Sequence, residues 1–366
     1  MAHTISQLQD YLESYYEYHM DTTVTTSAMS TKHMIINALL TKLDKVLRGA
    51  YPMLDFGKIE RVGSVYETLA VRGFSDFDAT FSIELSPDVW CMRKVNDFLP
   101  GFVDGLWLVM RQNAQGAPLA TSPVDTFLHG KYISPRAVKV AVKRALINSL
   151  HYMGLKAHIS ESGPAVSATI IGSSDETFDH PISLDITPYL HLQGTNCLVA
   201  KNLPYIKQCS CGTMNANNEN NIPEFHNANP LCHIWRKSYH KEARLRIAED
   251  VKIGCRRKVL IIVKALRYNC SVLSVLNSYQ LKTVFFHLCD HQTRWLPVDL
   301  SDRVLELLRE LKNWIDSGSL PSYFDRDRNL LAECSGKSLV DVSLWLDSII
   351  KLPEQNLIPL LQIQEK

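Results

Sequence analysis

The alternating run from Asp76 to Leu85 constrains the fold of this 366-residue chain more than any other segment. Apolar and polar side chains follow each other there with a period of two, which is the period of a β-strand whose two faces differ. The apolar face is expected to cover a core, within a strand, turn and strand at residues 58–86. The apolar set is Phe77, Ala79, Phe81, Ile83 and Leu85, and the polar set is Asp78, Thr80, Ser82 and Glu84.

Carboxylates stand at chemically suggestive positions in and beyond this run. Asp76 and Asp78 are two residues apart, so a strand places both on one side, where two like charges call for a cation such as magnesium. Asp185 lies between apolar residues of another expected strand, where an unpaired carboxylate is costly. Gly63 and Ser64 end a strand that is expected to lead into a helix, a place suited to binding phosphate. This ordered set is typical of nucleotidyltransferases, in which three carboxylates hold two divalent ions for phosphoryl transfer.

The rest of the chain reads as two lobes, as its length suggests. Apolar residues make up 46% and charged residues 21%, which excludes disordered and fibrous classes. No apolar run approaches the ~18 residues of a membrane span, and no export signal is expected. The predicted fold is α+β, with a mixed-sheet lobe at residues 1–205 and a helical lobe at 206–366, separated by an Asn-rich loop at 210–230. Helices are expected at about 5–48 (with a break near 22–31), 135–153, 235–249, 255–270, 277–290, 301–316 and 337–351, and further strands at 165–172 and 182–187.

Charge is distributed unevenly although the formal net charge is only +1. Residues 131–156 contain six Lys or Arg and no acid, and residues 236–268 contain eleven Lys or Arg against three acids. Either segment could present a basic face to a polyanion, and the alternative is a pair of solvated helix faces.

The segment GSVYETLAVRGFSDFDATF resembles the active-site segment of cyclic GMP–AMP synthase and the cGAS-like receptors of the male-abnormal (Mab) family. Four later segments agree in order and spacing over residues 58–325: ISLDIT, WRKSYHKEARLRI, GCRRKVLIIVKALR and LNSYQLKTVFFHLCDHQTRW. The resemblance implies a bilobed nucleotidyltransferase fold with a long N-terminal spine helix and an active site in the cleft. It also implies an enzyme that makes a cGAMP-like cyclic dinucleotide from ATP and GTP.

The same resemblance implies roles for individual residues. Ser64 and Ser278 would contact phosphate, Lys264 would reach the triphosphate, and Tyr279 would stack on a base. The implied catalytic ligands for Mg²⁺ or Mn²⁺ are Asp76, Asp78 and Asp185, and the implied nucleotide-binding set is Gly63, Ser64, Arg236, Lys264, Ser278 and Tyr279.

The sequence departs from the vertebrate enzyme in the segment from Glu242 to Cys255, which lacks the zinc loop that grips DNA. No structural zinc is expected, because Cys209, Cys211 and Cys232 do not form a closed tetrahedral set with nearby histidines. The product bases and linkage stay open, since Ala243 stands where the family has an acid.

Relatives without the zinc loop include receptors for double-stranded RNA, which is recognised through its shape and backbone. Double-stranded RNA is therefore favoured over DNA as the activator of a cytoplasmic innate-immune sensor that signals through a cyclic-dinucleotide receptor, with no membrane partner. Two alternatives are a catalytically silent Mab-family binding protein and a template-independent transferase acting on RNA ends. The residues expected to bind nucleic acid are Lys139, Lys143, Arg244, Arg256 and Arg257.

Overall fold

The computed structural model describes residues 2–20, 26–67, 69, 76–97, 106–112, 122–129, 131–174, 176–192, 197–201 and 233–361. Contacts between Cα atoms divide the chain into two compact units. The sheet unit comprises Ser27–Tyr66 and Ser75–Tyr239, and the helical unit comprises Met1–Thr26, Glu67–Phe74 and His240–Lys366. None of the described helices is both long and apolar enough to cross a bilayer.

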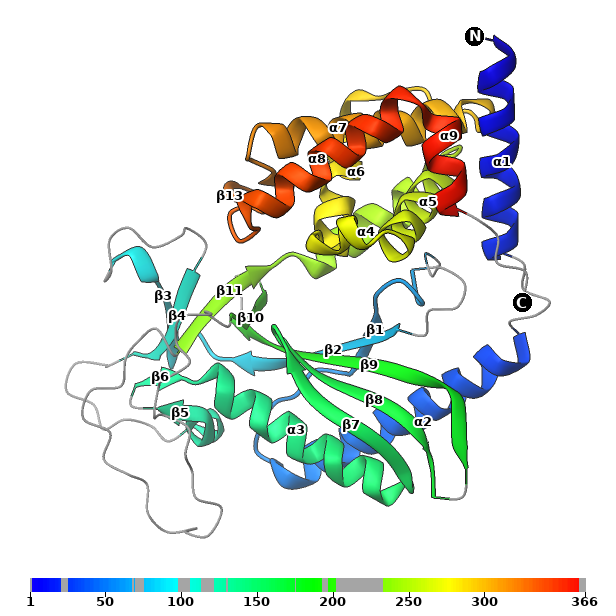
Figure 1. The fold of residues 1–366 in the computed structure, drawn as a ribbon. Coiled ribbons are helices and arrows are strands. Elements are labelled where there is room, and N and C mark those ends of the chain that lie inside the picture. The colour runs from blue at the N-terminus through cyan, green and yellow to red at the C-terminus, as the bar shows by residue number, and fades with distance from the viewer. Residues whose placement is uncertain are drawn as a thin grey trace. The chain divides into compact units, whose positions relative to one another are not determined.

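The sheet unit is built on one mixed sheet, to which the described residues contribute eleven strands (Figure 1). Its main path runs β1-β2-β9-β10-β11-β4-β6-β5, while β3 pairs with β4 and the β7–β8 hairpin pairs with β9 through β8. The strands are β1 (Glu60–Val62), β2 (Asp76–Leu85), β3 (Trp90–Lys94), β4 (Leu106–Arg111), β5 (Leu128–His129), β6 (Tyr132–Ile133), β7 (Leu155–Ser162), β8 (Ala165–Ser173), β9 (Thr177–Leu192), β10 (Cys197–Ala200) and β11 (Ile234–Ser238).

Strand β2 confirms the alternation on its apolar side and corrects the expectation for its polar side. Phe77 is 1% exposed and packs in the core of the sheet unit, as the pattern predicts. Thr80 and Ser82 are also buried, at 3% and 4% exposure. The Thr80 hydroxyl donates to the Thr187 carbonyl at 2.7 Å, so its burial leaves no unpaired donor. Both faces of β2 are therefore covered along its middle.

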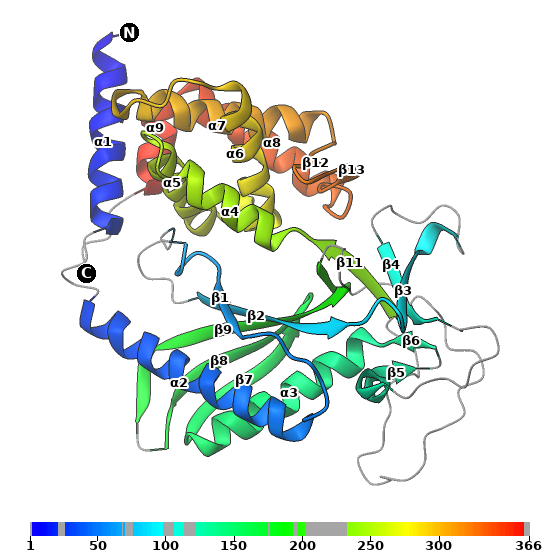
Figure 2. The ribbon, with the colours of Figure 1, turned by 180° about the vertical axis from the view of Figure 1, so that it is seen from behind.

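Helices α2 (Thr26–Ala50) and α3 (Pro135–Tyr152) contribute to the same core as the sheet (Figure 2). The start of α3 confirms the capping prediction: the Ser134 hydroxyl accepts the Ala137 amide at 3.3 Å, and Pro135 occupies the first turn. The apolar stripe of α2 comprises Ile36, Leu39, Leu40, Leu43 and Leu47.

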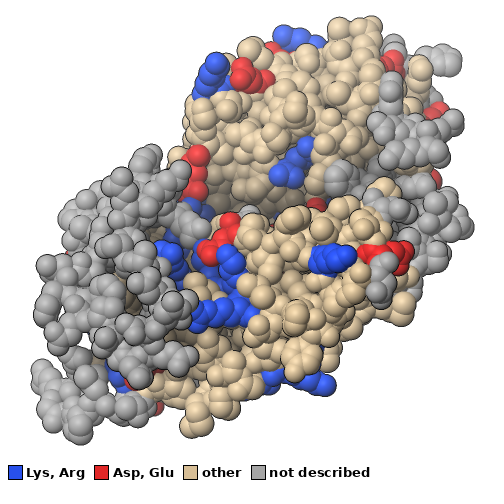
Figure 3. All heavy atoms as spheres, turned by 60° about the horizontal axis from the view of Figure 1, so that its bottom comes forward, with Lys and Arg blue, Asp and Glu red and all other residues tan. Residues whose placement is uncertain are grey.

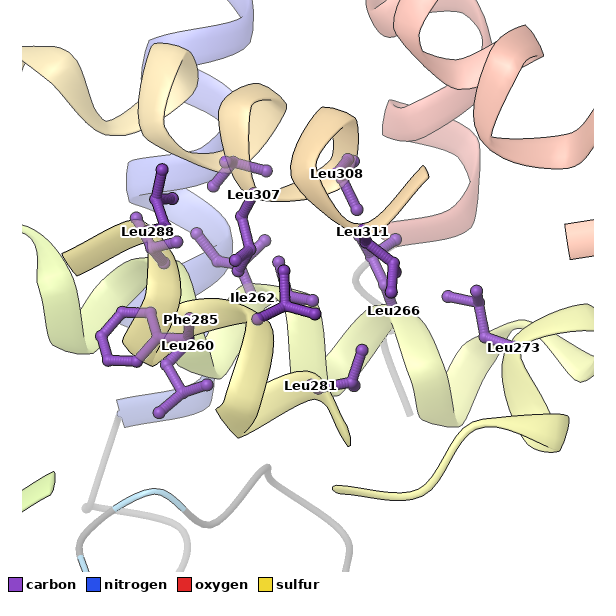
Figure 4. Packing of buried hydrophobic residues seen from close by; sticks show 14 of the residues in the cluster. Leu260, Ile262, Leu266, Leu273, Leu281, Phe285, Leu288, Leu307, Leu308 and Leu311 are labelled. Carbon is purple, nitrogen blue, oxygen red and sulfur yellow. The ribbon is translucent and has the colours of Figure 1, made fainter. Parts of the chain in front are cut away.

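The helical unit packs its helices around a single apolar cluster, part of which is shown in Figure 4. Helix α7 illustrates why, since Val304, Leu307, Leu308 and Leu311 repeat at helical spacing and are all buried. The helices are α1 (Ala2–Met20), α4 (His240–Asp250), α5 (Arg256–Asn269), α6 (Ser278–His291), α7 (Leu300–Asp316), α8 (Gly336–Lys351) and α9 (Pro353–Leu357), with a small hairpin of β12 (Pro321–Ser322) and β13 (Asp325–Asn329).

One expected helix is partly wrong. The helix predicted at residues 235–249 begins only at His240, because Ile234–Ser238 forms strand β11 between β10 and β4. Trp235 lies on this strand at 1% exposure, and its indole donates to the Ile133 carbonyl at 3.0 Å. The expected lobe boundary at 205/206 and the loop at 210–230 lie outside the described residues.

Candidate functional site

Two of the three expected catalytic carboxylates lie side by side in the sheet unit. Strands β2 and β9 run parallel, and their register places Asp78 opposite Asp185. Both residues are half-buried. Asp76 is exposed at the first position of β2 and stands opposite Ser183. The sheet therefore brings together two of the carboxylates that the sequence suggested, Asp78 and Asp185. Asp76 lies two residues before Asp78 on the same strand.

Gly63 lies directly against this pair, in a turn that only glycine adopts easily. Its φ is +82°, and a Cβ built on it would lie 1.9 Å from Oδ2 of Asp78. Ser64 follows in a turn rather than at the start of a helix, since residues 64–67 have turn geometry. The helix N-terminus that was expected to bind phosphate is thus not formed at residues 64–67.

Tyr66 encloses the same corner from the side. Its ring meets Phe77 edge-on, with the centroids 6.2 Å apart. Burial raises the pKa of the Tyr66 hydroxyl, the positive charge of Arg61 lowers it, and the negative charge of Asp78 raises it. Tyr66 therefore stays neutral at physiological pH.

The donor set does not fit the expected pair of Mg²⁺ or Mn²⁺ ions. A two-metal site requires three carboxylates that converge. Across the described parts of the chain, no group of three or more His, Cys, Asp or Glu side chains is placed to hold an ion. The described donor set therefore does not support phosphoryl transfer that depends on a metal ion. Cys209, Cys211 and Cys232, considered for zinc, lie outside the described residues.

The expected nucleotide-binding residues are divided between the two units. Arg236 is half-buried on β11 of the sheet unit. In the helical unit, Lys264 is 2% exposed, and its ammonium donates to the Leu69 carbonyl at 2.8 Å. Ser278 is the first residue of α6, and the Tyr279 hydroxyl lies 3.2 Å from that of Ser322. Their roles in nucleotide binding remain predictions.

Two of the five residues expected to bind nucleic acid are buried in ion pairs. Lys139 is 3% exposed, and its ammonium lies 2.8 Å from the Glu161 carboxylate. Arg256 is 8% exposed, lies 2.6 Å from the Asp250 carboxylate and stacks over the Trp295 ring.

The remaining three are more accessible. Lys143 and Arg257 are half-buried, and Arg244 is exposed. Lys139 and Lys143 belong to the sheet unit, whereas Arg244, Arg256 and Arg257 belong to the helical unit. Part of the basic character that suggested a polyanion surface is thus used inside the fold.

A histidine pair in the sheet unit escaped the sequence analysis. Nδ1 of His129 lies 2.8 Å from Nε2 of His233, so one ring donates a hydrogen bond to the other. Burial, and the charge of His129, lower the pKa of His233 to about 4. His129 ends strand β5 and His233 directly precedes β11, far away in the sequence, so no local pattern could have revealed the contact.

Comparison with known proteins gives two family matches. Residues 28–201 match the C-terminal domain of mitochondrial dynamics protein MID51-like proteins, and residues 255–347 match the Mab-21 protein HhH/H2TH-like domain. The chain has a nucleotidyltransferase-like fold of this Mab-21/MID51 kind, with an α+β mixed-sheet part followed by a helical part.

Individual relatives are similar over almost the whole chain. Mitochondrial dynamics protein MID49 of Xenopus laevis is 24% identical over 355 residues, which cover 95% of this chain and 70% of that protein. Mitochondrial dynamics protein MID51 of Danio rerio is 23% identical, with the same coverage of 95% and 70%. Cyclic GMP-AMP synthase-like receptor 3 of Stylophora pistillata is 24% identical over 76% of this chain.

These similarities correct the expected family and activity. The cGAS-like receptor covers less of the chain than the MID49 and MID51 proteins do, so the assignment to the cGAS-like receptors is wrong. The expected cyclic dinucleotide synthase is wrong as well. The two relatives that cover 95% of the chain are named for mitochondrial dynamics, and the described acids do not assemble a metal site.

The expected partners and location are corrected on the same ground. Double-stranded RNA, ATP, GTP and a downstream cyclic-dinucleotide receptor followed from the sensor assignment, as did a role in innate immunity and a cytoplasmic location. Relatives named for mitochondrial dynamics overturn all of these. The burial of Lys139 and Arg256 gives a physical reason against the RNA surface in particular.

Proposed function

We propose that this chain is a mitochondrial dynamics protein that works by binding rather than by nucleotide transfer. The observation that carries the proposal is the similarity to MID49 and MID51 over 95% of the chain. The match of residues 28–201 to the MID51-like model supports it, because these residues include Gly63, Asp78 and Asp185. A catalytically silent binding protein, the alternative to a cyclic dinucleotide synthase, therefore agrees better with these similarities.

The geometry around the acids supports a non-catalytic role. Asp78 and Asp185 face each other on neighbouring strands, Gly63 packs against Asp78, and no third ligand joins them among the described side chains. Phosphoryl transfer depends on precise placement and charge neutralisation, which this arrangement does not supply. The residues predicted to bind nucleotide remain candidates for binding a ligand. A nucleotide titration that compares the Ser64→Ala variant with the native chain tests this role.

Removal and rescue in cells test the proposal. Cells that lack the native protein should show an altered mitochondrial network, and the full chain should restore it. The double variant Asp78→Asn, Asp185→Asn should restore the network equally well, because no step depends on either carboxylate. An unchanged network after removal would contradict the mitochondrial role, and failure of a stably folded double variant would contradict the non-catalytic one.

A further inference from the structure

Helix α3 carries a continuous stripe on the side that faces away from the core. Arg136, Val140, Lys143 and Ile147 follow each other at intervals of four, three and four residues, which places them on one helical face. Arg144 lies beside Lys143 and is exposed. The opposite face, which includes Val138, Val142, Leu146 and Leu150, is buried in the sheet unit. The stripe therefore combines basic with apolar side chains.

The apolar members of this surface are exposed to a degree that the fold does not require. Ile147 is 44% exposed, and Tyr152 at the end of the helix is 74% exposed. The ammonium of Lys42, on α2, lies 3.6 Å from the centre of the Tyr152 ring. Tyr152 lies five residues after Ile147, about 140° further around the helix, so it stands beside the stripe and not on it. The stripe itself sets basic residues next to an exposed aliphatic side chain, which suits a helix that lies at a membrane interface.

The charge of this surface is positive and little offset. Residues 131–156 contain no acid. Three carboxylates of the sheet unit have internal partners: Glu161 binds Lys139, Asp125 binds Arg111, and Asp44 binds Arg48. No ion pair with another described residue engages Lys143 or Arg144. Figure 3, which brings forward the lower side of Figure 1, shows separate Lys and Arg side chains on a mostly uncharged face, some of them beside Asp or Glu.

We propose that the outward face of α3 docks the protein on an anionic lipid surface. The basic side chains would lie against acidic headgroups, and Ile147 would enter the boundary between headgroups and acyl chains. An RNA duplex offers phosphates but no apolar layer for Ile147, so it matches only half of the surface. The inference goes beyond the mitochondrial proposal and does not depend on it.

Vesicle flotation with the full chain tests the docking. Vesicles of four parts phosphatidylcholine to one part phosphatidylserine should bind the protein, vesicles of pure phosphatidylcholine should not, and binding should weaken as salt rises. The double variant Lys143→Glu, Arg144→Glu should lower the partition coefficient by at least about thirtyfold, since losing each basic residue weakens binding about fivefold and the new carboxylates also repel the headgroups. Ile147→Ser should lower it by roughly tenfold, since an aliphatic side chain is lost from the interface.

The matched control reverses two exposed basic residues of the helical unit, Arg326→Glu and Lys337→Glu, with the same change in net charge. It should keep at least half of the binding, and all variants should unfold at the native midpoint. Absence of binding to acidic vesicles would overturn the proposal, as would an equal loss in the control or an unaffected Ile147→Ser variant. Binding of a long RNA duplex in place of the vesicles, lost in the Lys143→Glu, Arg144→Glu variant, would assign the surface to nucleic acid instead.

Discussion

Both units bury opposite charges in pairs, and the sheet unit also places two like charges side by side. The helical unit buries charges as opposite pairs: Asp250 and Arg256 are 3% and 8% exposed, and their side chains lie 2.6 Å apart. The sheet unit holds two like charges, Asp78 and Asp185, side by side at half-buried positions. The buried pair stabilises the fold only while both partners are present. The facing carboxylates repel each other, so their pairing adds nothing to stability.

The difference shows why an excess of basic residues is a poor guide to a binding surface. The segment 236–268 has the larger excess, yet its Arg256 and Lys264 are buried and bonded within the helical unit. The smaller excess at residues 131–156 leaves Arg144 exposed on α3. Each segment holds both kinds of residue, since Lys139 is buried within 131–156 and Arg244 is exposed within 236–268. Burial, which the sequence expresses only weakly, therefore decides residue by residue which side chains can meet a partner.

The largest expected effect breaks the opposite pair in the helical unit. Asp250 accepts hydrogen bonds from both Arg246 and Arg256, so Asp250→Ala leaves the buried Arg256 guanidinium without its carboxylate. We expect a loss of about 3–5 kcal/mol in the free energy of unfolding, measured by urea titration. The control Lys252→Ala, at a nearby exposed residue, should change it by less than about 0.5 kcal/mol. Similar small losses in both would mean that the pair is not structural.

The second prediction concerns acid stability, to which each unit contributes one buried histidine. Burial lowers the pKa of His233 in the sheet unit and of His240 in the helical unit from 6.5 to about 4. Between those values the unfolded chain takes up protons that the folded chain does not, so stability is lost as the pH falls. The expected loss is roughly 3 kcal/mol for each histidine.

Unfolding midpoints measured from pH 7 to pH 4 check this loss. His233→Gln should remove about half of the pH dependence, and His158→Gln, at an exposed position, should leave it unchanged. A pH profile that is the same in the native chain and in His233→Gln would show that His233 is not held neutral by burial.

Much of the fold follows from local sequence signals, and the exceptions have physical causes. Ser134 with Pro135 predicts the start of α3, and the leucine spacing predicts α7, because capping and helical periodicity are local. The short strands β3, β4 and β10 were not foreseen, since strand pairing is a long-range property. The sequence predicts a helix where strand β11 forms, because WRKS joins directly to a strongly helical segment.

The candidate site was predictable only in part, because it too depends on contacts between residues that are far apart in the sequence. Spacing on a strand brings Asp78 to the sheet, and register brings Asp185 beside it, which the pattern anticipated. Whether a third ligand converges depends on side-chain directions that no spacing encodes, and the described residues form no such group. Family motifs retained in a binding protein look the same in sequence as those of an enzyme.

The third prediction separates structure from ligand binding at Lys264. The substitution Lys264→Met keeps the length and apolar body of the side chain but removes the donor to the Leu69 carbonyl. We expect a loss of about 1–2 kcal/mol in the free energy of unfolding, because that carbonyl loses a buried hydrogen bond. Urea titration measures it, and Lys337→Met, at an exposed residue, serves as the control. Unchanged stability together with weakened nucleotide binding would instead support the role that the sequence predicts for Lys264, which is to reach the triphosphate.

The smallest effect, and the sharpest test of the contrast between the units, is expected at the facing carboxylates. Asp185→Asn removes one of two like charges on neighbouring strands, so it should stabilise the sheet unit by about 0.5 kcal/mol. If the pair held a metal ion, millimolar magnesium chloride would raise the unfolding midpoint of the native chain, because a ligand that binds only the folded state stabilises it. We expect no such shift, and none in Asp185→Asn. A magnesium-dependent rise in the unfolding midpoint of the native chain that disappears in Asp185→Asn would show that the two carboxylates bind the ion together. The sheet unit would then neutralise these carboxylates with a cation from solution, where the helical unit neutralises Asp250 with an arginine.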